Sequence, residues 1–157
     1  MSKQLRFEIR EVSTPQERQG YDRVIMPVYR KEFGWDKQQM DKFDSYFRNH
    51  RRFVACLLDG EPGRVIGTGM LAENNWKGKH AVSRLAVDKD FQENGVGSAI
   101  GERLEEEAKK MGLREVILFC VKRKIDSYVK KGFQLIESIG REPGAREDSF
   151  LLLKKLD

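Results

Sequence analysis

No stretch of this sequence approaches the roughly 20 consecutive apolar residues that a helix needs to cross a lipid bilayer. Residues 1–7 also lack the apolar core of a secretory signal. The chain has two cysteines, Cys56 and Cys120, and each lies in an apolar, strand-like run. That placement favours two free, buried thiols in a reducing compartment over a disulfide framework. We therefore expect a cytoplasmic protein that does not act in a membrane.

Histidine is equally scarce. His50 and His80 stand apart from each other and from the cysteines, so no cluster has the spacing of metal ligands and we expect no metal. The formal net charge of +5 would suit a nucleic-acid partner. However, 25 acidic residues are mixed among 30 basic ones, and no aromatic residues are interleaved with the densest basic run, 122–124. A base-stacking surface needs such aromatics, so we expect no nucleic-acid partner.

What the chain does have is the composition of a folded domain. Its 157 residues suit one domain, residues 1–157, with a core that needs no disulfide staples. A hydrophobic content of 39% beside a charged content of 35% is typical of soluble globular proteins. Linkers, repeats and low-complexity segments are absent from the sequence.

Periodicity and capping signals predict an α/β protein with the element order βααβββαβαββ. The first helix has a capping-box pattern at Thr14 and Glu17, and Gly34 is placed to end it. Asp36 is placed to cap the second helix, and turn residues at 59–63 predict a hairpin. Strands are expected at 6–12, 53–58, 65–71, 81–87, 115–121, 133–139 and 150–153, and helices at 15–33, 37–49, 96–111 and 125–131.

The segment from Gln92 to Ser98 carries the strongest functional signal. It follows an apolar strand and leads directly into a long helix, and it contains Gly95 and Gly97. The first N–H groups of a helix have no intrahelical partner, and glycine lets a ligand approach the backbone closely. The segment therefore predicts a phosphate or pyrophosphate site. A Rossmann dinucleotide turn fits poorly because its third glycine would fall at Ile100. A plain strand-to-helix turn stays open.

The motifs Gln92-x-x-Gly95-x-Gly97 and Tyr128-x-x-x-Gly132-Phe133, together with the element order, resemble the GNAT superfamily of acyl-CoA-dependent N-acyltransferases. The resemblance covers nearly the whole chain. It implies a mixed α/β sheet whose fourth and fifth strands splay apart around coenzyme A. It also implies acetyl-CoA as co-substrate and a primary amine as acceptor, and we expect that amine to belong to a small molecule.

The same resemblance implies roles for individual residues. Backbone groups of the glycine turn and of the fourth strand would hold the coenzyme, with Lys124 as an added phosphate contact. Tyr128 would protonate the leaving thiolate, since a phenol is neutral at pH 7 and can donate a proton. The cofactor-binding residues expected on this basis are Leu85, Ala86, Val87, Gln92, Glu93, Asn94, Gly95, Val96, Gly97, Ser98 and Lys124.

The chain departs from the family pattern around the site. Val121 stands where many members have a coenzyme-contacting asparagine, and Ser83 where some have a catalytic glutamate. Asn94 replaces a basic residue that often precedes the first glycine. No carboxylate is therefore matched as general base. Glu73 is the best remaining candidate; Glu147, Asp148, His80 and water are the alternatives, and Cys120 could in principle carry an acyl group.

The acceptor side is less defined by the sequence. Arg30, Phe33, Trp35, Asp41 and Asp44 resemble the start of acyl-homoserine-lactone synthases, which share the GNAT fold. A transferase with another acyl donor and a non-catalytic acyl-CoA-binding module are therefore kept as alternatives. We expect the acceptor amine to be held by carboxylates and the protein to be a monomer or homodimer. The candidate carboxylates are Asp41, Asp44, Glu73, Glu147 and Asp148.

Overall fold

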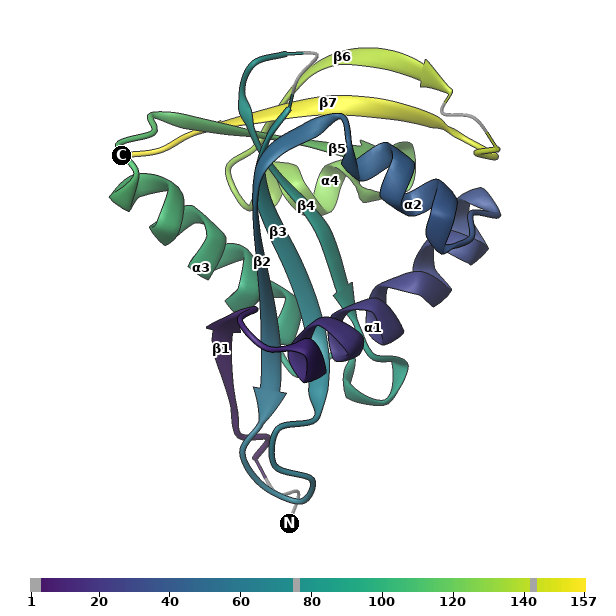
Figure 1. The fold of residues 1–157 in the computed structure, drawn as a ribbon. Helices are drawn as coiled ribbons and strands as arrows, with labels where there is room; N and C mark the ends of the chain where they lie inside the picture. The colour runs from purple at the N-terminus through teal and green to yellow at the C-terminus, as the bar shows by residue number, and fades with distance from the viewer. Residues whose placement is uncertain (1–3, 75–76, 142–143) are drawn as a thin grey trace.

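The computed structural model describes residues 4–74, 77–141 and 144–157, so the first three residues of the N-terminal segment considered above lie outside it. One seven-stranded sheet runs through the molecule in the order β1-β2-β3-β4-β5-β7-β6 (Figure 1). The predicted fold class and element order are confirmed. The elements are β1 (Phe7–Glu11), α1 (Pro15–Phe33), α2 (Lys37–Asp44), β2 (Phe47–Leu57), β3 (Val65–Asn74), β4 (His80–Val87), α3 (Val96–Lys110), β5 (Glu115–Val121), α4 (Ile125–Lys130), β6 (Gln134–Arg141) and β7 (Asp148–Lys155).

Helices cover both faces of the sheet. In Figure 1, α1 and α2 lie on one side of β2–β4 and α3 lies on the other. Alternation along β2 explains why both faces are buried, because successive side chains of a strand point in opposite directions. Val54 and Cys56 pack with α1, whereas Phe53, Ala55 and Leu57 pack with α3.

Local signals set the ends of α1. The Thr14 hydroxyl accepts a hydrogen bond from the Glu17 N–H, and the Glu17 carboxylate accepts one from the Thr14 N–H, so the predicted capping box is present. Gly34 ends the helix with a φ of 68°, a left-handed conformation that glycine adopts without strain.

The second helix is shorter than predicted, and this expectation was wrong. It ends at Asp44 rather than near Asn49, and β2 begins at Phe47 rather than at Phe53. The polar run before Phe53 pairs with the end of β3, where Arg48 lies opposite Glu73. Long-range pairing with a neighbouring strand thus outweighs a helical pattern in the polar residues.

The helix α3 lies unusually close to the sheet. Its apolar stripe, Val96, Ile100, Leu104 and Ala108, is buried against β2, β3 and β5. Gly69 in β3 makes the close approach possible, because a Cβ there would lie 2.5 Å from the Ile100 Cγ2 atom. The start of α3 is therefore held rigidly beside the end of β4.

The sheet opens between β4 and β5. Within the described residues, their parallel pairing is confined to Ala81 opposite Ile117, and the strands part from there (Figure 1). A bulge follows in β4, where Ser83 pairs with Met70 and Ala86 with Thr68. Arg84 in this bulge has a φ of 55°, and its carbonyl oxygen accepts a hydrogen bond of 2.7 Å from the Thr68 hydroxyl. The splay and the bulge create the space for a site.

Both cysteines are free and buried, as predicted. Among the described residues, no helix combines the length and apolar character that crossing a membrane requires.

Candidate active site

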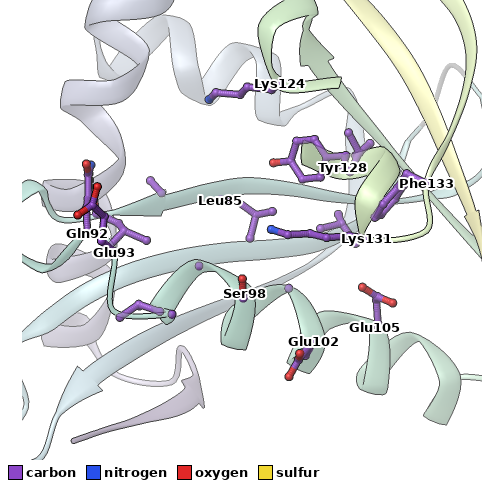
Figure 2. A pocket seen from close by; sticks show the side chains of 18 of the residues that line it. Leu85, Gln92, Glu93, Ser98, Glu102, Glu105, Lys124, Tyr128, Lys131 and Phe133 are labelled. Atoms are coloured by element: carbon purple, nitrogen blue, oxygen red, sulfur yellow. Dashed lines mark hydrogen bonds between the residues drawn. The ribbon is translucent and has the colours of Figure 1, made fainter. Parts of the chain in front are cut away.

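A first cavity of about 670 Å³ lies where the end of β4 faces the start of α3 and the short helix α4 (Figure 2). Leu85 comes from β4, Ser98 from α3 and Tyr128 from α4, and Figure 2 shows the three around one open space. The glycine turn and the predicted acid, far apart in the sequence, are thus brought to one cavity.

The start of α3 is built to leave backbone N–H groups available. Gly95 is the N-cap, with a φ of 77°, and it has no side chain to satisfy the first N–H groups of the helix. Gly97 follows on the cavity wall, and among the described residues a Cβ there would meet the Val87 Cγ2 atom alone, at 3.5 Å. These groups and the helix dipole favour an anion at this point.

The predicted cofactor-binding residues lie together, with one exception. Asn94 does not line the first cavity; its side-chain amide donates to the carbonyl oxygens of Phe91 and Gln92 and so holds the turn. Lys124 lines the cavity, but its ammonium lies 3.2 Å from the Glu32 carboxylate. The others that line the cavity are Leu85, Ala86, Val87, Gln92, Glu93, Gly95, Val96, Gly97 and Ser98.

Two cations at this cavity were not singled out from the sequence as ligand contacts. Lys131 follows Tyr128 by one turn and Lys154 comes from β7, and both line the first cavity. Lys154 is paired with Glu105 at 2.7 Å, whereas the Lys131 ammonium lies 5.6 Å from the centroid of the Tyr128 ring. Lys131 falls at an unspecified position of the motif Tyr128-x-x-x-Gly132-Phe133, so the motif gave no reason to select it.

Tyr128 is half-buried and held by its neighbours. Its ring meets the Phe133 ring edge-on, with centroids 5.8 Å apart. In Figure 2 its hydroxyl points into the space between Lys124 and Leu85. Burial, with a smaller contribution from Cys120, raises the pKa of Tyr128 to about 12. The hydroxyl therefore keeps its proton at any physiological pH and can act as a donor.

A second, larger cavity of about 1070 Å³ adjoins the first. Tyr128, Leu85, Val28 and Lys124 line both cavities, so the two spaces meet at these side chains. The second cavity lies between the α1–α2 region and the open side of the sheet, and Ser83 and Val121 line it. Besides Tyr128, its aromatic lining residues are Tyr29, Phe33, Trp35, Phe43, Tyr46, Phe47 and Phe119.

The structure does not bring the predicted acceptor carboxylates together. Glu73 lines neither cavity and is paired with Arg48 at 3.0 Å; its role as base stays a prediction that this position does not favour. Asp44 is buried in ion pairs with Arg52 and Arg84. The rest lie outside both cavities: Asp41 is exposed, Glu147 pairs with Arg123, and Asp148 pairs with Arg141.

Sequence reasoning missed Glu32, which is the one carboxylate among the described residues lining the second cavity. It stands in the last turn of α1, and its carboxylate lies 3.2 Å from Lys124 and 3.4 Å from Arg123. A glutamate two residues before a helix-ending glycine carries no signal of its own. Only the packing of α1 against the opened sheet places it in a cavity.

Cys120 also lines the second cavity, where it could be considered as a nucleophile. Burial raises the pKa of its thiol to about 11. The thiolate is the nucleophilic form, so Cys120 is poorly suited to carry an acyl group at neutral pH. Among the described residues, no three His, Cys, Asp or Glu side chains are grouped as metal ligands.

The solved structures that this chain resembles share its whole fold. An acetyltransferase of the GNAT family from Staphylococcus aureus aligns with a TM-score of 0.72 at 16% identity, covering 97% of this chain and 100% of that one. An N-acyl amino acid synthase from uncultured soil microbes aligns with a TM-score of 0.76 at 13% identity, covering 97% and 92%. N-acetylglutamate synthase from Neisseria gonorrhoeae, complexed with coenzyme A and N-acetyl-glutamate, aligns at 0.70 and 15%, covering 99% and 36%.

Sequence comparison identifies the family independently. No curated protein sequence is significantly similar to the chain. The model of the acetyltransferase (GNAT) family, however, matches residues 16–133, which include the glycine turn and Tyr128. This match over most of its length shows that the chain belongs to the GNAT acetyltransferase family.

Proposed function

We propose that the chain is a cytoplasmic, single-domain N-acetyltransferase that moves the acetyl group of acetyl-CoA to the primary amine of a small molecule. The observation that carries this proposal is the meeting of two cavities at Tyr128 and Leu85. One cavity has an anion-binding helix start and the other an aromatic wall. Two different ligands could thus meet at one proton donor, as direct transfer in a ternary complex requires.

The first cavity suits the coenzyme. The N–H groups at the start of α3 would bind its pyrophosphate, and Gly95 and Gly97 leave room for a phosphate against the backbone. Lys131 would add a positive charge. Among the described residues, β4 is not paired with β5 beyond Ala81, so backbone groups on that edge could bind the amides of the pantetheine arm.

The junction of the two cavities, at Tyr128 and Leu85, suits the chemistry of acetyl transfer. Acetyl-CoA supplies a thioester carbon to which the amine nitrogen bonds as the carbon–sulfur bond breaks. The Tyr128 hydroxyl would donate a proton to the departing sulfur, and its raised pKa keeps that proton available. The acceptor arrives as an ammonium and must lose a proton before it can attack. Glu32 lines the second cavity and would hold the ammonium and accept that proton, directly or through water.

Release of free thiol from acetyl-CoA in the presence of a panel of amines tests this proposal. The expected result is amine-dependent release of thiol together with an acetylated amine of matching amount by mass spectrometry. If the protein binds acetyl-CoA tightly but releases no thiol from it with any amine of the panel, a non-catalytic acyl-CoA-binding module is favoured.

A longer acyl donor is the second candidate, favoured by the size and aromatic lining of the second cavity. An acyl chain passing the junction would enter that cavity and leave less room for the acceptor. Comparing acetyl-CoA with octanoyl-CoA against the same amines separates the two, since our first proposal requires acetyl-CoA to be the better donor.

A further inference from the structure

The second cavity is lined by more cations than anions. Four cations line it, namely Lys42, Arg84, Lys124 and Arg141, whereas Glu32 is the one anion among the described lining residues. Arg84 and Arg141 are also paired with carboxylates outside the cavity, those of Asp44 and Asp148. Glu32 is also already paired with Lys124 and Arg123. A cavity with this composition suits a ligand that carries negative charge in addition to its reactive amine.

Arg84 is the most deeply buried of these cations. Its side chain is 9% exposed and that of Asp44 is 6% exposed. The Asp44 carboxylate accepts a hydrogen bond of 2.9 Å from the Arg84 Nε atom and also pairs with Arg52 at 3.4 Å. Among the described residues, two guanidinium groups thus share the Asp44 carboxylate, so the buried cluster of Arg84, Asp44 and Arg52 carries a net positive charge. Burying a cluster with a net charge is unfavourable, so an anionic group bound beside Arg84 would be stabilised.

The guanidinium of Arg84 is held in a fixed position with donors to spare. The Arg84 Nη1 atom donates to the Tyr29 hydroxyl at 2.7 Å, and the group lies over the Tyr29 and Phe47 rings. Its main chain is fixed in the β4 bulge by the bond from Thr68. With Asp44 and Tyr29 as partners, three of its five N–H groups are used within the described residues. Two N–H groups are thus left to bind a carboxylate.

The rest of the cavity indicates what accompanies that carboxylate. Phe33, Trp35 and Phe43 are stacked, with ring centroids 4.4 Å and 4.1 Å apart, and together with Tyr29 they form a continuous apolar wall. Such a wall suits a large apolar or aromatic group. Glu32 offers an anionic contact for an ammonium from the end of α1.

We propose, building on the function proposed above, that the acceptor is an α-amino acid with a large apolar or aromatic side chain. Arg84 binds the carboxylate, the aromatic wall takes the side chain, and the amino group faces the junction at Tyr128. This replaces the expectation that carboxylates alone hold the acceptor, because Asp44 is occupied by the two arginines.

Matched pairs of acceptors test the inference on the wild-type protein. L-phenylalanine and phenethylamine, and likewise L-tryptophan and tryptamine, differ by the carboxylate. With acetyl-CoA as donor, kcat/KM for the amino acid should exceed that for the amine by at least about tenfold, as the loss of a charge-assisted hydrogen bond implies. Equal or faster turnover of the amines overturns the inference and leaves the proposed acetyltransferase intact. If acetyl-CoA binds but no member of the panel is acetylated, this acceptor class is wrong. If acetyl-CoA does not bind, the proposed function itself fails.

Matched variants assign the effect to Arg84. In Arg84→Lys, the preference for the amino acid over the amine should fall about tenfold, since lysine cannot bind a carboxylate as a planar fork. Affinity for acetyl-CoA should be unchanged. Arg48→Lys is the control, because Arg48 is exposed and paired with Glu73 outside both cavities. An unchanged preference in Arg84→Lys overturns the assignment.

A non-reactive probe covers the case in which the Arg84 variant does not fold. 3-Phenylpropionate retains the carboxylate and ring but lacks the amine, and it should inhibit the wild type competitively against L-phenylalanine. Absence of inhibition at concentrations well above the KM of L-phenylalanine would count against a carboxylate site.

Discussion

Tyr128 and Leu85 approach one point from different elements, and each lines both the first and the second cavity. Tyr128 comes from α4, which follows β5, and Leu85 follows Arg84 of the bulge in β4. Because β4 and β5 part after Ala81, the two side chains border an open junction rather than a paired sheet. The predictions below test what is bound on each side of this junction.

Replacing Gly97 by glutamate should abolish binding of acetyl-CoA. The new carboxylate would occupy the helix start and repel the pyrophosphate, whereas the fold should survive because the added Cβ meets only Val87, at 3.5 Å. Calorimetry should show affinity reduced by about 100-fold or more, if several charge-assisted bonds are lost. Gln16→Glu places the same charge at the start of α1, away from both cavities, and should bind as the wild type does. Unchanged affinity in Gly97→Glu would mean that the phosphate site lies elsewhere.

Removing the hydroxyl of Tyr128 as Tyr128→Phe should lower kcat by about 10²-fold, the usual contribution of a general acid, with little change in acetyl-CoA affinity. The pKa of Tyr128 is about 12, so the wild-type rate should not decline between pH 7 and 10 through loss of this proton. Steady-state kinetics over that range checks both statements. A variant within a few-fold of wild type would make Tyr128 a packing residue.

The two candidate carboxylates can be compared directly. Glu32→Gln should lower kcat/KM for the amine by about 100-fold or more, the lower end of a general base contribution, because Glu32 lines the acceptor side. For Glu73→Gln, kcat/KM for the amine should stay within about twofold of the wild-type value, as expected of a surface substitution, since Glu73 is paired with Arg48 outside both cavities. If pH–rate profiles instead show a large loss of activity in Glu73→Gln and little change in Glu32→Gln, Glu73 is the base and Glu32 is not.

Glu107 should stabilise the fold in a pH-dependent way. Its side chain, 10% exposed, accepts hydrogen bonds from Arg103 and Arg51, both at 3.0 Å. The Arg103 hydrogen bond, opposed by burial and helped by Arg51, lowers the pKa of Glu107 below its ordinary value. A carboxylate whose pKa is lower in the folded state stabilises at pH values above its unfolded pKa, and this contribution is lost as pH falls through the folded pKa.

Glu107→Gln should therefore reduce the free energy of unfolding at pH 7 by about 1–3 kcal/mol, as expected when charged hydrogen bonds are lost. The difference from wild type should shrink as the pH is lowered through the acidic range. Urea denaturation at pH 7 and in mild acid measures it, with the exposed Glu106→Gln as control. A difference that does not change with pH would contradict the role of the charge.

The close packing of α3 on the sheet can be tested with two glycines. Gly69→Ala should lower the free energy of unfolding by about 1–3 kcal/mol, the usual cost of overpacking, because its Cβ would lie 2.5 Å from Ile100. Gly101→Ala should instead be neutral or stabilising, by up to about 1 kcal/mol from helix propensity, since no described atom outside its own helical backbone would lie within 4 Å of the added Cβ. Thermal denaturation that ranked the two variants the other way would contradict this packing.

Features encoded by neighbouring residues were predictable from the sequence. The ends of α1 follow from Thr14, Glu17 and Gly34, and the glycine turn follows from its position between a strand and a helix. Features that depend on distant partners were not. The start of β2 depends on pairing with β3, so the polar residues before Phe53 carry no local strand signal.

The acceptor side shows the same limit. Asp44 was expected to hold an amine, yet its partner Arg84 lies 40 residues further along the chain and neutralises it. Glu32 was overlooked because only the splay of β4 and β5 opens a cavity beside α1. Motifs that act through backbone geometry, such as the glycine turn, could thus be recognised from the sequence. Side chains that come together only through packing, such as Glu32 and Arg84, could not.

A crystal structure of the protein bound to coenzyme A tests the central claim most directly. We expect the pyrophosphate at the backbone N–H groups that begin α3, between Gly95 and Ser98. The coenzyme sulfur should lie within hydrogen-bonding reach of the Tyr128 hydroxyl, at about 3.5 Å. A pyrophosphate bound elsewhere, or a sulfur directed away from the junction of the two cavities, would contradict the proposed site.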